Sequence, residues 1–361
     1  MSEQLIEEKY ILQNEAKTEG LVFRPYDFDF LPQDEGRFID DVYSGETFWR
    51  SLLRRLFRNK GSVFGLICIV LIVFFAVFGP IMSPYTYDQQ VSGHESMAPR
   101  IPGLERLGIF DGSEVLQTST GPREINKYKD IAGGEDVYHW FGTDVLGRDI
   151  FTRVWTGTRI SLYIAVVAVV VDILIGMTYG MISGYFGGTV DIVMQRIIEV
   201  LNGIPSLVVV TLLIIIMKPG LTSITTAIAI TGWIGMARIS RAEVLKLKEH
   251  EYVLAARTLG AGSGNLIFKE MLPNIFSQLL IMSMFSIPSA IFTEAFLAFI
   301  GIGIPVPMAS LGSLISDHFK SLTTHGYMIV YPVLVLALLM LSFNLLADGL
   351  RDALDPTMKE A

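Results

Sequence analysis

The chain has 361 residues, of which 51% are hydrophobic and only 18% are charged. An average soluble domain carries about 25% charged residues, so the composition excludes a disordered chain and an ordinary water-soluble protein. The formal net charge of -8 argues against nucleic acid as a partner, because it provides no basic field for a phosphate backbone. The single cysteine and the five scattered histidines indicate neither an internal disulfide nor a metal cluster.

The N-terminal part, residues 1–61, is expected to be a cytoplasmic extension. Residues 1–47 are polar and acid-rich and lack the apolar periodicity of a core, so we expect partial disorder there. Residues 62–83 are expected to form the first transmembrane helix, because their charge-free run is long enough to cross about 30 Å of hydrocarbon. A signal peptide is disfavoured by the position and length of this run.

An extracytoplasmic segment, residues 84–160, follows and is rich in Gly, Pro and polar residues, which is typical of a small irregular subdomain or a docking surface. Further apolar runs cover residues 161–183, 200–217, 219–237, 271–293 and 321–347. With the first helix they predict six transmembrane helices, five of them in a core of residues 161–350. The run 295–316 contains several Gly and Pro residues, and we expect an irregular or re-entrant segment there.

Basic residues set the expected orientation. Arg50, Arg54, Arg55, Arg58 and Lys60 precede the first helix without an acid among them, which places the N-terminus in the cytoplasm. Six spans return the tail, residues 351–361, to the same side. The loop of residues 241–274 then lies in the cytoplasm as well.

This loop carries a short helical pattern. Tyr252, Ala255, Ala256 and Leu259 recur at helical spacing, and Gly260, followed by two more glycines, is expected to end the helix. Such a helix, with no soluble domain to cover it, fits the groove of a separate protein or the membrane surface. The spacing leaves both alternatives open.

The loop resembles the EAA motif of ABC importer permeases. The matching residues are Leu254, Ala255, Ala256 and Gly260, followed by Leu272, Pro273 and Asn274. The glutamate that names the motif is Leu254 here, and Glu251 lies one turn earlier. Residues 139–151, 294–303 and 344–356 resemble stretches of the second permease subunit of peptide importers, so the resemblance extends from about residue 49 to residue 356.

The resemblance implies an all-α integral membrane protein with the type I ABC importer permease fold and a cytoplasmic coupling helix, in the inner membrane of a bacterial or archaeal cell. It implies oligopeptide transport, and as partners a homologous second permease subunit, two ATP-binding subunits, an extracytoplasmic peptide-binding protein and membrane lipid. ATP and magnesium would be bound by the partner subunits and no cofactor by this chain. The residues that would couple to the ATPase subunits are Glu251, Tyr252, Ala255, Ala256, Arg257, Leu259 and Gly260.

The absence of a nucleotide site also follows from the residues. The sequence contains no Gly-Lys dipeptide, so the phosphate-binding GxxxxGK[ST] loop cannot occur in it. An intramembrane protease is disfavoured because both His-Glu pairs lack the second histidine of the zinc motif. The remaining alternatives are a dipeptide or nickel permease and a self-sufficient secondary transporter or channel; the latter is disfavoured because the sequence has no obvious repeated halves.

Two acidic residues fall within or beside apolar runs, where charge is costly. Asp172 and Glu294 are candidates for the translocation path or for gating. The favoured alternatives are a neutral Asp172 hydrogen-bonded between helices, and a Glu294 near water at the outer end of its span. Arg148 and Asp149 would hold the extracytoplasmic segment, meet the binding protein, or form a weak surface ion pair. The glycines 176, 180, 184, 187 and 188 favour close helix packing over hinge motion.

Overall fold

The computed structural model describes residues 48–118, 121–131 and 134–354. The chain divides into two units, Met1–Ser51 and Leu52–Ala361, and the second contains the architecture described below. The disorder expected for residues 1–47 and the last residues of the expected tail lie outside the described residues.

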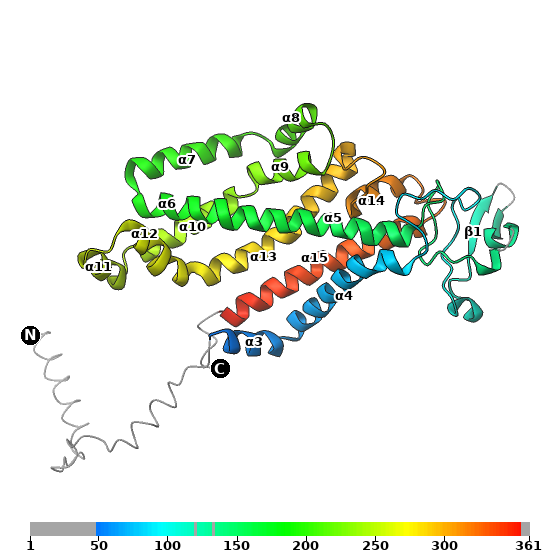
Figure 1. The fold of residues 1–361 in the computed structure, drawn as a ribbon, viewed down its shortest axis with the longest axis horizontal. Coiled ribbons are helices and arrows are strands. Elements are labelled where there is room, and N and C mark those ends of the chain that lie inside the picture. Colours follow the sequence, from blue (N-terminus) through cyan, green and yellow to red (C-terminus); the bar gives the residue numbers. More distant parts are fainter. Residues whose placement is uncertain (1–47, 119–120, 132–133, 355–361) are drawn as a thin grey trace, which may run out of the picture. The chain divides into compact units, whose positions relative to one another are not determined.

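Long helices that run side by side form the body of the second unit (Figure 1). One of them is continuous over α5, the π-helical turn η5 and α6, and the others are α4, α13 and α15. Asn59 begins α4 by accepting hydrogen bonds from the backbone amides of Gly61 and Ser62. The bounds are α4 (Lys60–Met82), α5 (Ile150–Val171), η5 (Asp172–Met177), α6 (Thr178–Phe186), α13 (Leu272–Leu297) and α15 (Tyr327–Leu354).

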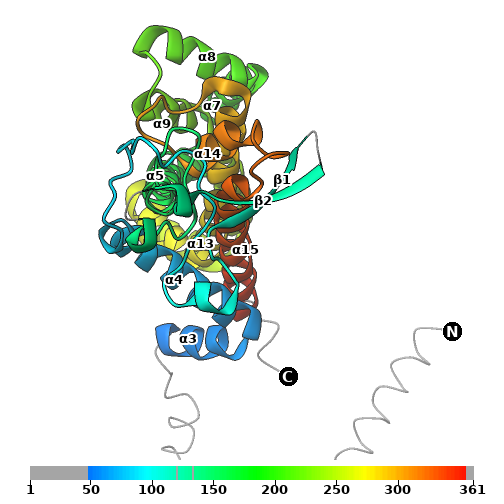
Figure 2. The same cartoon turned by 90° about the vertical axis from the view of Figure 1, so that its right-hand side faces the viewer.

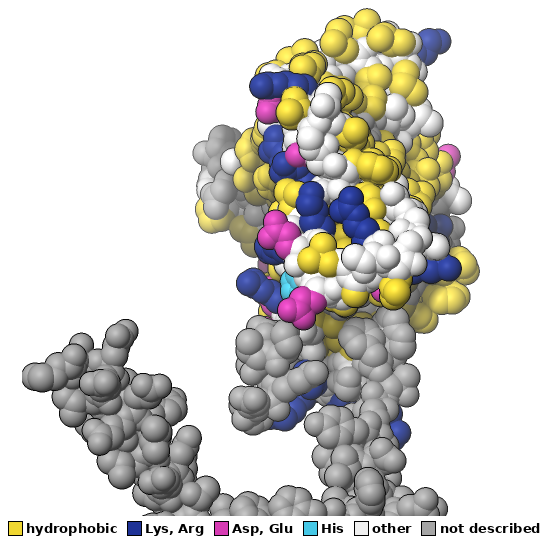
Figure 3. Space-filling view, turned by 90° about the vertical axis from the view of Figure 1, so that its left-hand side faces the viewer, with side chains coloured by type: hydrophobic (Ala, Val, Ile, Leu, Met, Phe, Trp, Pro, Cys, Tyr) yellow, Lys and Arg dark blue, Asp and Glu magenta, His cyan; other side chains and the backbone are white. Residues whose placement is uncertain are grey.

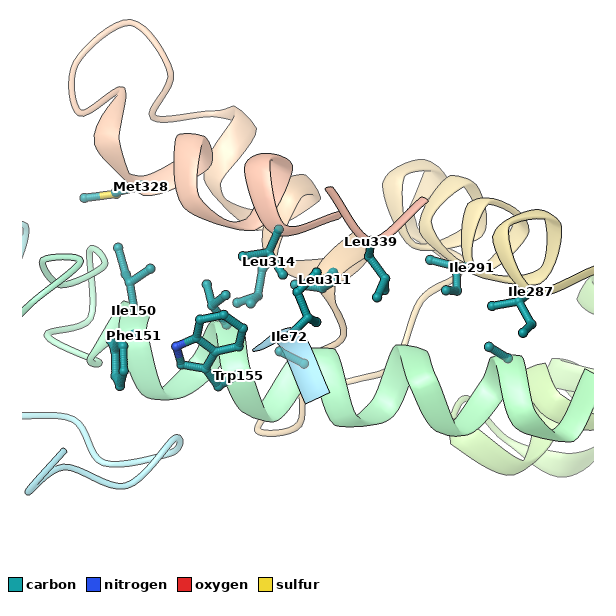
Figure 4. Packing of buried hydrophobic residues seen from close by; sticks show 14 residues of the cluster. Ile72, Ile150, Phe151, Trp155, Ile287, Ile291, Leu311, Leu314, Met328 and Leu339 are labelled. Carbon is teal, nitrogen blue, oxygen red and sulfur yellow. The ribbon is translucent and has the colours of Figure 1, made fainter. Parts of the chain in front are cut away.

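The largest buried cluster fills the space between these helices (Figure 4). The side chains of Ile150, Phe151 and Trp155 on α5 meet residues of α14 (Leu311–Phe319) and α15. The indole ring of Trp155 stacks on the ring of Phe75 from α4, with centroids 5.0 Å apart. Because α5 contacts α4, α13, α14 and α15, it is the central helix of the unit.

The expected count of six transmembrane helices is not confirmed. Among the described residues, four helices are long and apolar enough to cross a membrane, or up to five if a bent pair counts as one span. That pair is α7 (Gly188–Gly203) and α8 (Ser206–Met217), which meet at an angle of 78°. The expected third span, residues 200–217, crosses this bend at Pro205, which has no backbone N–H to continue a helix.

The expected fourth span, residues 219–237, also consists of two helices. They are α9 (Leu221–Thr231) and α10 (Ile234–Leu247), separated by Gly232 and Trp233. The 11 residues of α9 reach only about 17 Å, less than the hydrocarbon core. Charged residues such as Arg241 and Lys246 lie in the second half of α10, so the apolar run overstated the length of a single span.

Two other boundaries bear on the expectations. The second long helix begins at Ile150 rather than at residue 161, because Asp149 caps it by accepting from the amide of Thr152. The irregular segment expected over residues 295–316 is confirmed only for its middle, residues 303–310, because the flanking residues belong to α13, η7 and α14. There the π-helical turn η7 (Ala298–Ile302) ends in a loop after Gly301, whose φ of +86° leaves the helical region, and α14 follows.

Residues 84–149, called the hairpin segment below, are irregular as expected but contain a β-hairpin that the sequence did not suggest. Strands β1 (Ser113–Thr118) and β2 (Gly121–Asn126) pair antiparallel, with Ser113 opposite Asn126. Figure 2 looks onto the end of the unit that carries this hairpin. The segment also has 3₁₀ turns at η2 (Leu104–Leu107), η3 (Lys127–Asp130) and η4 (Gly134–Asp136).

At the other end of the helices, α3 (Phe48–Arg58) joins the end of α15. Within the second unit, Leu52 and Leu56 of α3 are buried against Leu350 and Ala353. The Asn59 side chain donates to the carboxylate of Asp352 at 3.1 Å. These contacts fix the start of α4 to the last turn of α15.

A glycine seam joins the second long helix to α10, as the spacing predicted. A methyl group added at Gly176 would lie 2.7 Å from the carbonyl oxygen of Trp233, and one at Gly184 would lie 2.8 Å from that of Arg241. At Gly180, between them, the Cβ would collide with the backbone carbonyl of Ala237. The packing interpretation is therefore confirmed for these glycines, which let two helix backbones touch.

We expect Gly180→Ala to destabilise the protein by about 1–3 kcal/mol, because the added methyl group meets backbone that cannot move aside. Gly203→Ala is the matched control, since a Cβ there has open space and alanine favours helix. Thermal unfolding of the purified variants in detergent measures both. Equal melting temperatures for Gly180→Ala and the parent chain would contradict a tight seam.

Candidate functional site

The loop after α10 folds into α11 (Glu251–Thr258), and the helix ends where the glycine predicted. Gly260 has a φ of +88°, and its amide donates to the carbonyl of Arg257 at 3.1 Å. The amide of Ala261 donates to the carbonyl of Ala256 at 3.0 Å. This pair of bonds is the Schellman motif, which closes a helix with a left-handed residue, usually glycine.

Only one side of α11 packs against other described residues of the chain. Val253 is buried, and Ala256 and Ala261 pack beside it on a cluster that includes Leu266 and Ile267. These last two residues belong to η6 (Leu266–Met271), which follows the short α12 (Ser263–Asn265) and leads into α13. The α11 helix is thus attached directly to a long helix.

The expected apolar face of α11 needs one correction. Tyr252, Ala255 and Leu259 are exposed as a docking face requires, and 89% of the Leu259 surface is accessible. Ala256, however, is half-buried against the chain's own cluster. It packs beside Val253, which lies outside the face expected from the sequence, so Ala256 holds the helix in place rather than being presented outward.

The polar residues singled out on α11 lie on the surface. Glu251 and Arg257 are exposed, as is Leu254 at the position of the motif's glutamate. Partial desolvation of its hydroxyl, together with the nearby Glu270 carboxylate, raises the pKa of Tyr252 above its ordinary value. Figure 3 looks onto the end of the unit that carries α11 and shows Lys and Arg side chains among hydrophobic ones.

An ion pair holds α10, the helix before the loop, to the start of α7. Nε of Arg241 donates to Asp191 Oδ1 at 2.6 Å, and Nη2 donates to Oδ2 at 2.5 Å. Ser183 of α6 donates to the same carboxylate at 2.5 Å. A bidentate pair of this kind is directional, so the three helices move together at this end.

Asp172 lies between helices and lines a cavity of about 380 Å³. Only 4% of its surface is accessible, and its carboxyl group interacts with the Ser286 hydroxyl of α13. The structure thus places Asp172 both beside a helix partner and at the wall of a cavity. Both interpretations of this residue remain predictions.

The favoured interpretation placed Glu294 near water at the outer end of its span, and this is wrong. It is fully buried, and its carboxylate accepts hydrogen bonds from Ser310 and, at 3.4 Å, from Ser161. Ser310 caps α14, which folds back over the end of α13. The acid therefore joins α5, α13 and α14, and its part in translocation remains a prediction.

The hairpin segment is fastened to α5 by buried polar groups, called the clamp below, of which the sequence indicated only Arg148 and Asp149. Asp149 accepts from the Thr152 amide at 2.9 Å and pairs with Nδ1 of His139 at 2.9 Å. Nε of Arg148 donates to Asp144 at 2.6 Å. Arg148 and Asp149 thus have separate buried partners, and the expectation of a weak surface ion pair between them is wrong. The alternative in which these two residues hold the segment in place is confirmed.

Beside the clamp lie two further buried groups. Arg153 is 1% exposed; its Nη1 donates to the carbonyl of Tyr87 at 3.1 Å, and its Nε lies 3.8 Å from Asp144. Nδ1 of His318 donates to the carbonyl of Met328 at 2.9 Å, and its Nε2 has no partner among the described residues. Burial lowers the pKa of His318, so the ring is neutral at neutral pH.

We expect the protein to lose stability as the pH falls below about 6.5, the usual histidine value. Burial lowers the pKa of both His318 and His94 in the folded chain, so the unfolded chain binds these protons first. Stability is complete above pH 6.5 and falls by at most about 1.4 kcal/mol per pH unit for each histidine.

Melting temperatures of the purified chain between pH 8 and pH 5 measure this dependence. His318→Gln should flatten the profile, whereas His250→Gln, at an exposed position, should leave it unchanged. An identical profile for His318→Gln and the parent chain would contradict the assignment.

The comparison with protein families decides the identity. Residues 176–360 match the model of the binding-protein-dependent transport system inner membrane component, and residues 47–99 match the N-terminal TM domain of oligopeptide transport permease C. The chain belongs to the first of these families. It is therefore a multi-pass membrane component of a binding-protein-dependent transport system, and the fold class expected from the sequence is confirmed apart from the helix count.

Curated relatives of this membrane component align over nearly their whole length. The oligopeptide transport system permease protein OppC of Bacillus subtilis (strain 168) is 41% identical, over 87% of this chain and 91% of the relative. The dipeptide transport system permease protein DppC of the same organism is 39% identical, over 93% and 94%. OppC of Escherichia coli (strain K12) is 34% identical, over 86% and 92%.

A solved structure shows a more distant likeness. A chain of the MetNI methionine ABC transporter, in inward-facing conformations, has a TM-score of 0.47 and 16% identity, over 56% of this chain and 97% of that chain.

Proposed function

We propose that this chain is one of two permease subunits of an ATP-driven ABC importer of oligopeptides. The near full-length similarity to the oligopeptide and dipeptide permease proteins of Bacillus subtilis is the observation that supports the substrate class most strongly. Dipeptides are the second candidate, because the dipeptide relative is almost as similar and covers more of the chain.

In this proposal α11 is the docking element for an ATP-binding subunit. It presents Tyr252, Ala255 and Leu259 outward and is closed by Gly260, while Glu251 and Arg257 flank the face. An exposed apolar helix outside the long helices lowers its free energy by entering a groove of another protein. The chain itself would bind neither ATP nor magnesium, which belong to the partner subunits, because no Gly-Lys dipeptide is available for a phosphate loop.

Basic residues at the start of α4 support a cytoplasmic position for that end of the helix. Arg54 and Arg58 precede α4, Lys60 begins it, and the C-terminal turn of α15 packs against α3. Both termini would then be cytoplasmic, and the hairpin segment would face the extracytoplasmic peptide-binding protein.

The coupling mechanism follows from the attachment of α11. Closure of two ATP-binding subunits would push on α11, and Val253 would transmit the displacement to η6 and α13. The pair Arg241–Asp191 and the glycine seam would carry α6 and α7 along with α10. Rocking of these helices against the homologous permease would open the pathway first to one side and then to the other, which is a rigid-body transition.

Purification of the tagged chain from its native membrane tests the assembly, and uptake by proteoliposomes tests the transport. We expect a second permease and ATP-binding subunits to co-purify, and labelled trialanine to enter only with both ATP and the binding protein present. Purification of the chain alone, with uptake that needs no ATP, would show a channel or a secondary transporter instead.

A further inference from the structure

The cavity at Asp172 lies between α5, the broken pair α9 and α10, the start of α8, and α13. Asp172 is the only ionisable side chain among the described residues that line it. The other polar groups in the wall are hydroxyls, from Ser206, Thr231, Ser286, Ser289 and Thr293. The wall thus offers oxygen atoms and one acid.

The acid has no cationic partner in the described part of the chain. Among the described residues its side chain interacts with the Ser286 hydroxyl, and 4% of its surface is accessible. A carboxylate so far from water is costly, and a cation that enters the cavity removes much of that cost. The group that fits this wall is therefore positively charged.

The size and the apolar wall identify the kind of cation. A cavity of about 380 Å³ has more than ten times the volume of roughly 30 Å³ that one water occupies, so it suits an organic group better than a bare ion. Apolar side chains such as Ile228, Met236 and Phe285 share the wall with the hydroxyls. An ammonium group attached to a small apolar residue meets both kinds of surface.

The backbone around Asp172 leaves room for such a group. Asp172 begins the π-helical turn η5, a distortion that is often found at functional sites because it displaces side chains from the regular helix. Across the cavity, a Cβ added at Gly235 would have no heavy atom within 4 Å. The space beside the acid is thus open on the α10 side.

We propose that this cavity binds the N-terminal ammonium group of a peptide in transit, with Asp172 as its counter-charge. The inference rests on the proposed function, because it takes the ligand to be the transported peptide. The hydroxyls accept the remaining N–H donors, and the apolar wall contacts the first side chain. Asp172 then acts in the recognition of the substrate's N-terminal end.

Equilibrium binding to the complete transporter in nanodiscs, without the binding protein, tests this directly. The probes are trialaninamide, which carries an N-terminal ammonium group, and N-acetyl-trialaninamide, which is neutral and otherwise the same. We expect the parent complex to bind the cationic probe about tenfold more tightly, as one charge-assisted contact provides. Asp172→Asn should make the two affinities equal, and Asp172→Glu should keep a preference for the cation.

Two further variants separate charge from volume. Gly235→Leu should weaken the binding of both probes to the same extent, because the leucine side chain fills the cavity and leaves the acid in place. Glu199→Gln removes an exposed carboxylate elsewhere and should change neither affinity.

Equal affinities of the parent complex for the two probes would overturn the proposal, even if Asp172→Asn failed to fold. So would a preference for the cation that survives in Asp172→Asn. Uptake of trialanine by the parent complex is measured in parallel. ATP-dependent uptake without discrimination between the probes contradicts only this inference, whereas no ATP-dependent uptake at all contradicts the proposed function.

Discussion

Replacing Leu259 by Asp should remove the ATP-binding subunits from the purified complex while leaving the chain in the membrane. Leu259 is 89% exposed and lies outside the chain's own buried clusters, so the change costs the isolated chain little. In an assembled complex it would bury an unpaired carboxylate in an interface, which costs at least about 2 kcal/mol, or more than tenfold in affinity. Co-purification followed by mass spectrometry measures the loss.

The matched control is Leu107→Asp, which introduces the same charge at a 71% exposed leucine of the hairpin segment. It should leave the ATP-binding subunits attached. Ala256→Glu makes a different comparison, because that residue packs on the chain's own cluster and its change should loosen the loop itself. Retention of the subunits by Leu259→Asp at parental levels would exclude α11 as the docking element.

Replacing Asp144 by Ala should be among the most damaging single changes in the hairpin segment. It leaves the buried Arg148 without its carboxylate and Arg153 with only that of Asp317, 4.0 Å away, and it removes the acceptor for the backbone amides of Leu146 and Arg148. Breaking a buried charge pair by removing one partner costs about 3–5 kcal/mol. We expect a marked fall in melting temperature and rapid proteolysis within residues 84–149.

Glu199→Ala is the control for that prediction. The carboxylate of Glu199 lies 2.5 Å from Nη1 of Arg196, but both side chains are more than half exposed. Such a pair contributes about 0–1 kcal/mol, so the melting temperature should hardly move. Resistance of Asp144→Ala to proteolysis equal to that of Glu199→Ala would show that the clamp does not hold the segment.

The position and end of α11 could be read from the sequence because both are local properties. Helical spacing places Tyr252, Ala255 and Leu259 together, and Gly260 alone supplies the left-handed residue that the Schellman motif requires. The orientation of Ala256 could not be read, because it depends on which side of α11 meets η6. Small apolar residues such as Ala256 suit a buried contact and an exposed one equally well.

The errors at the long helices have a different origin. A charge-free run measures hydrophobicity, but it does not show that the backbone bends at Pro205 or breaks at Gly232. Glu294 looked like a residue at the water boundary because its apolar run ends there, yet α14 folds back and covers it through Ser310. The clamp was underestimated for a related reason, since the partner of Arg148 depends on the path of the whole hairpin segment.

The exposure of Leu259 also bears on how the cell handles this chain. Together with Tyr252 and Ala255, this leucine forms an exposed apolar face outside the long apolar spans, the kind of surface that aggregates or is bound by chaperones and proteases. A copy synthesised in excess of its docking partner would keep this surface uncovered and be removed. The amount of the chain in a cell would then follow the supply of its partner, and subunit stoichiometry would be maintained by degradation as well as by gene expression.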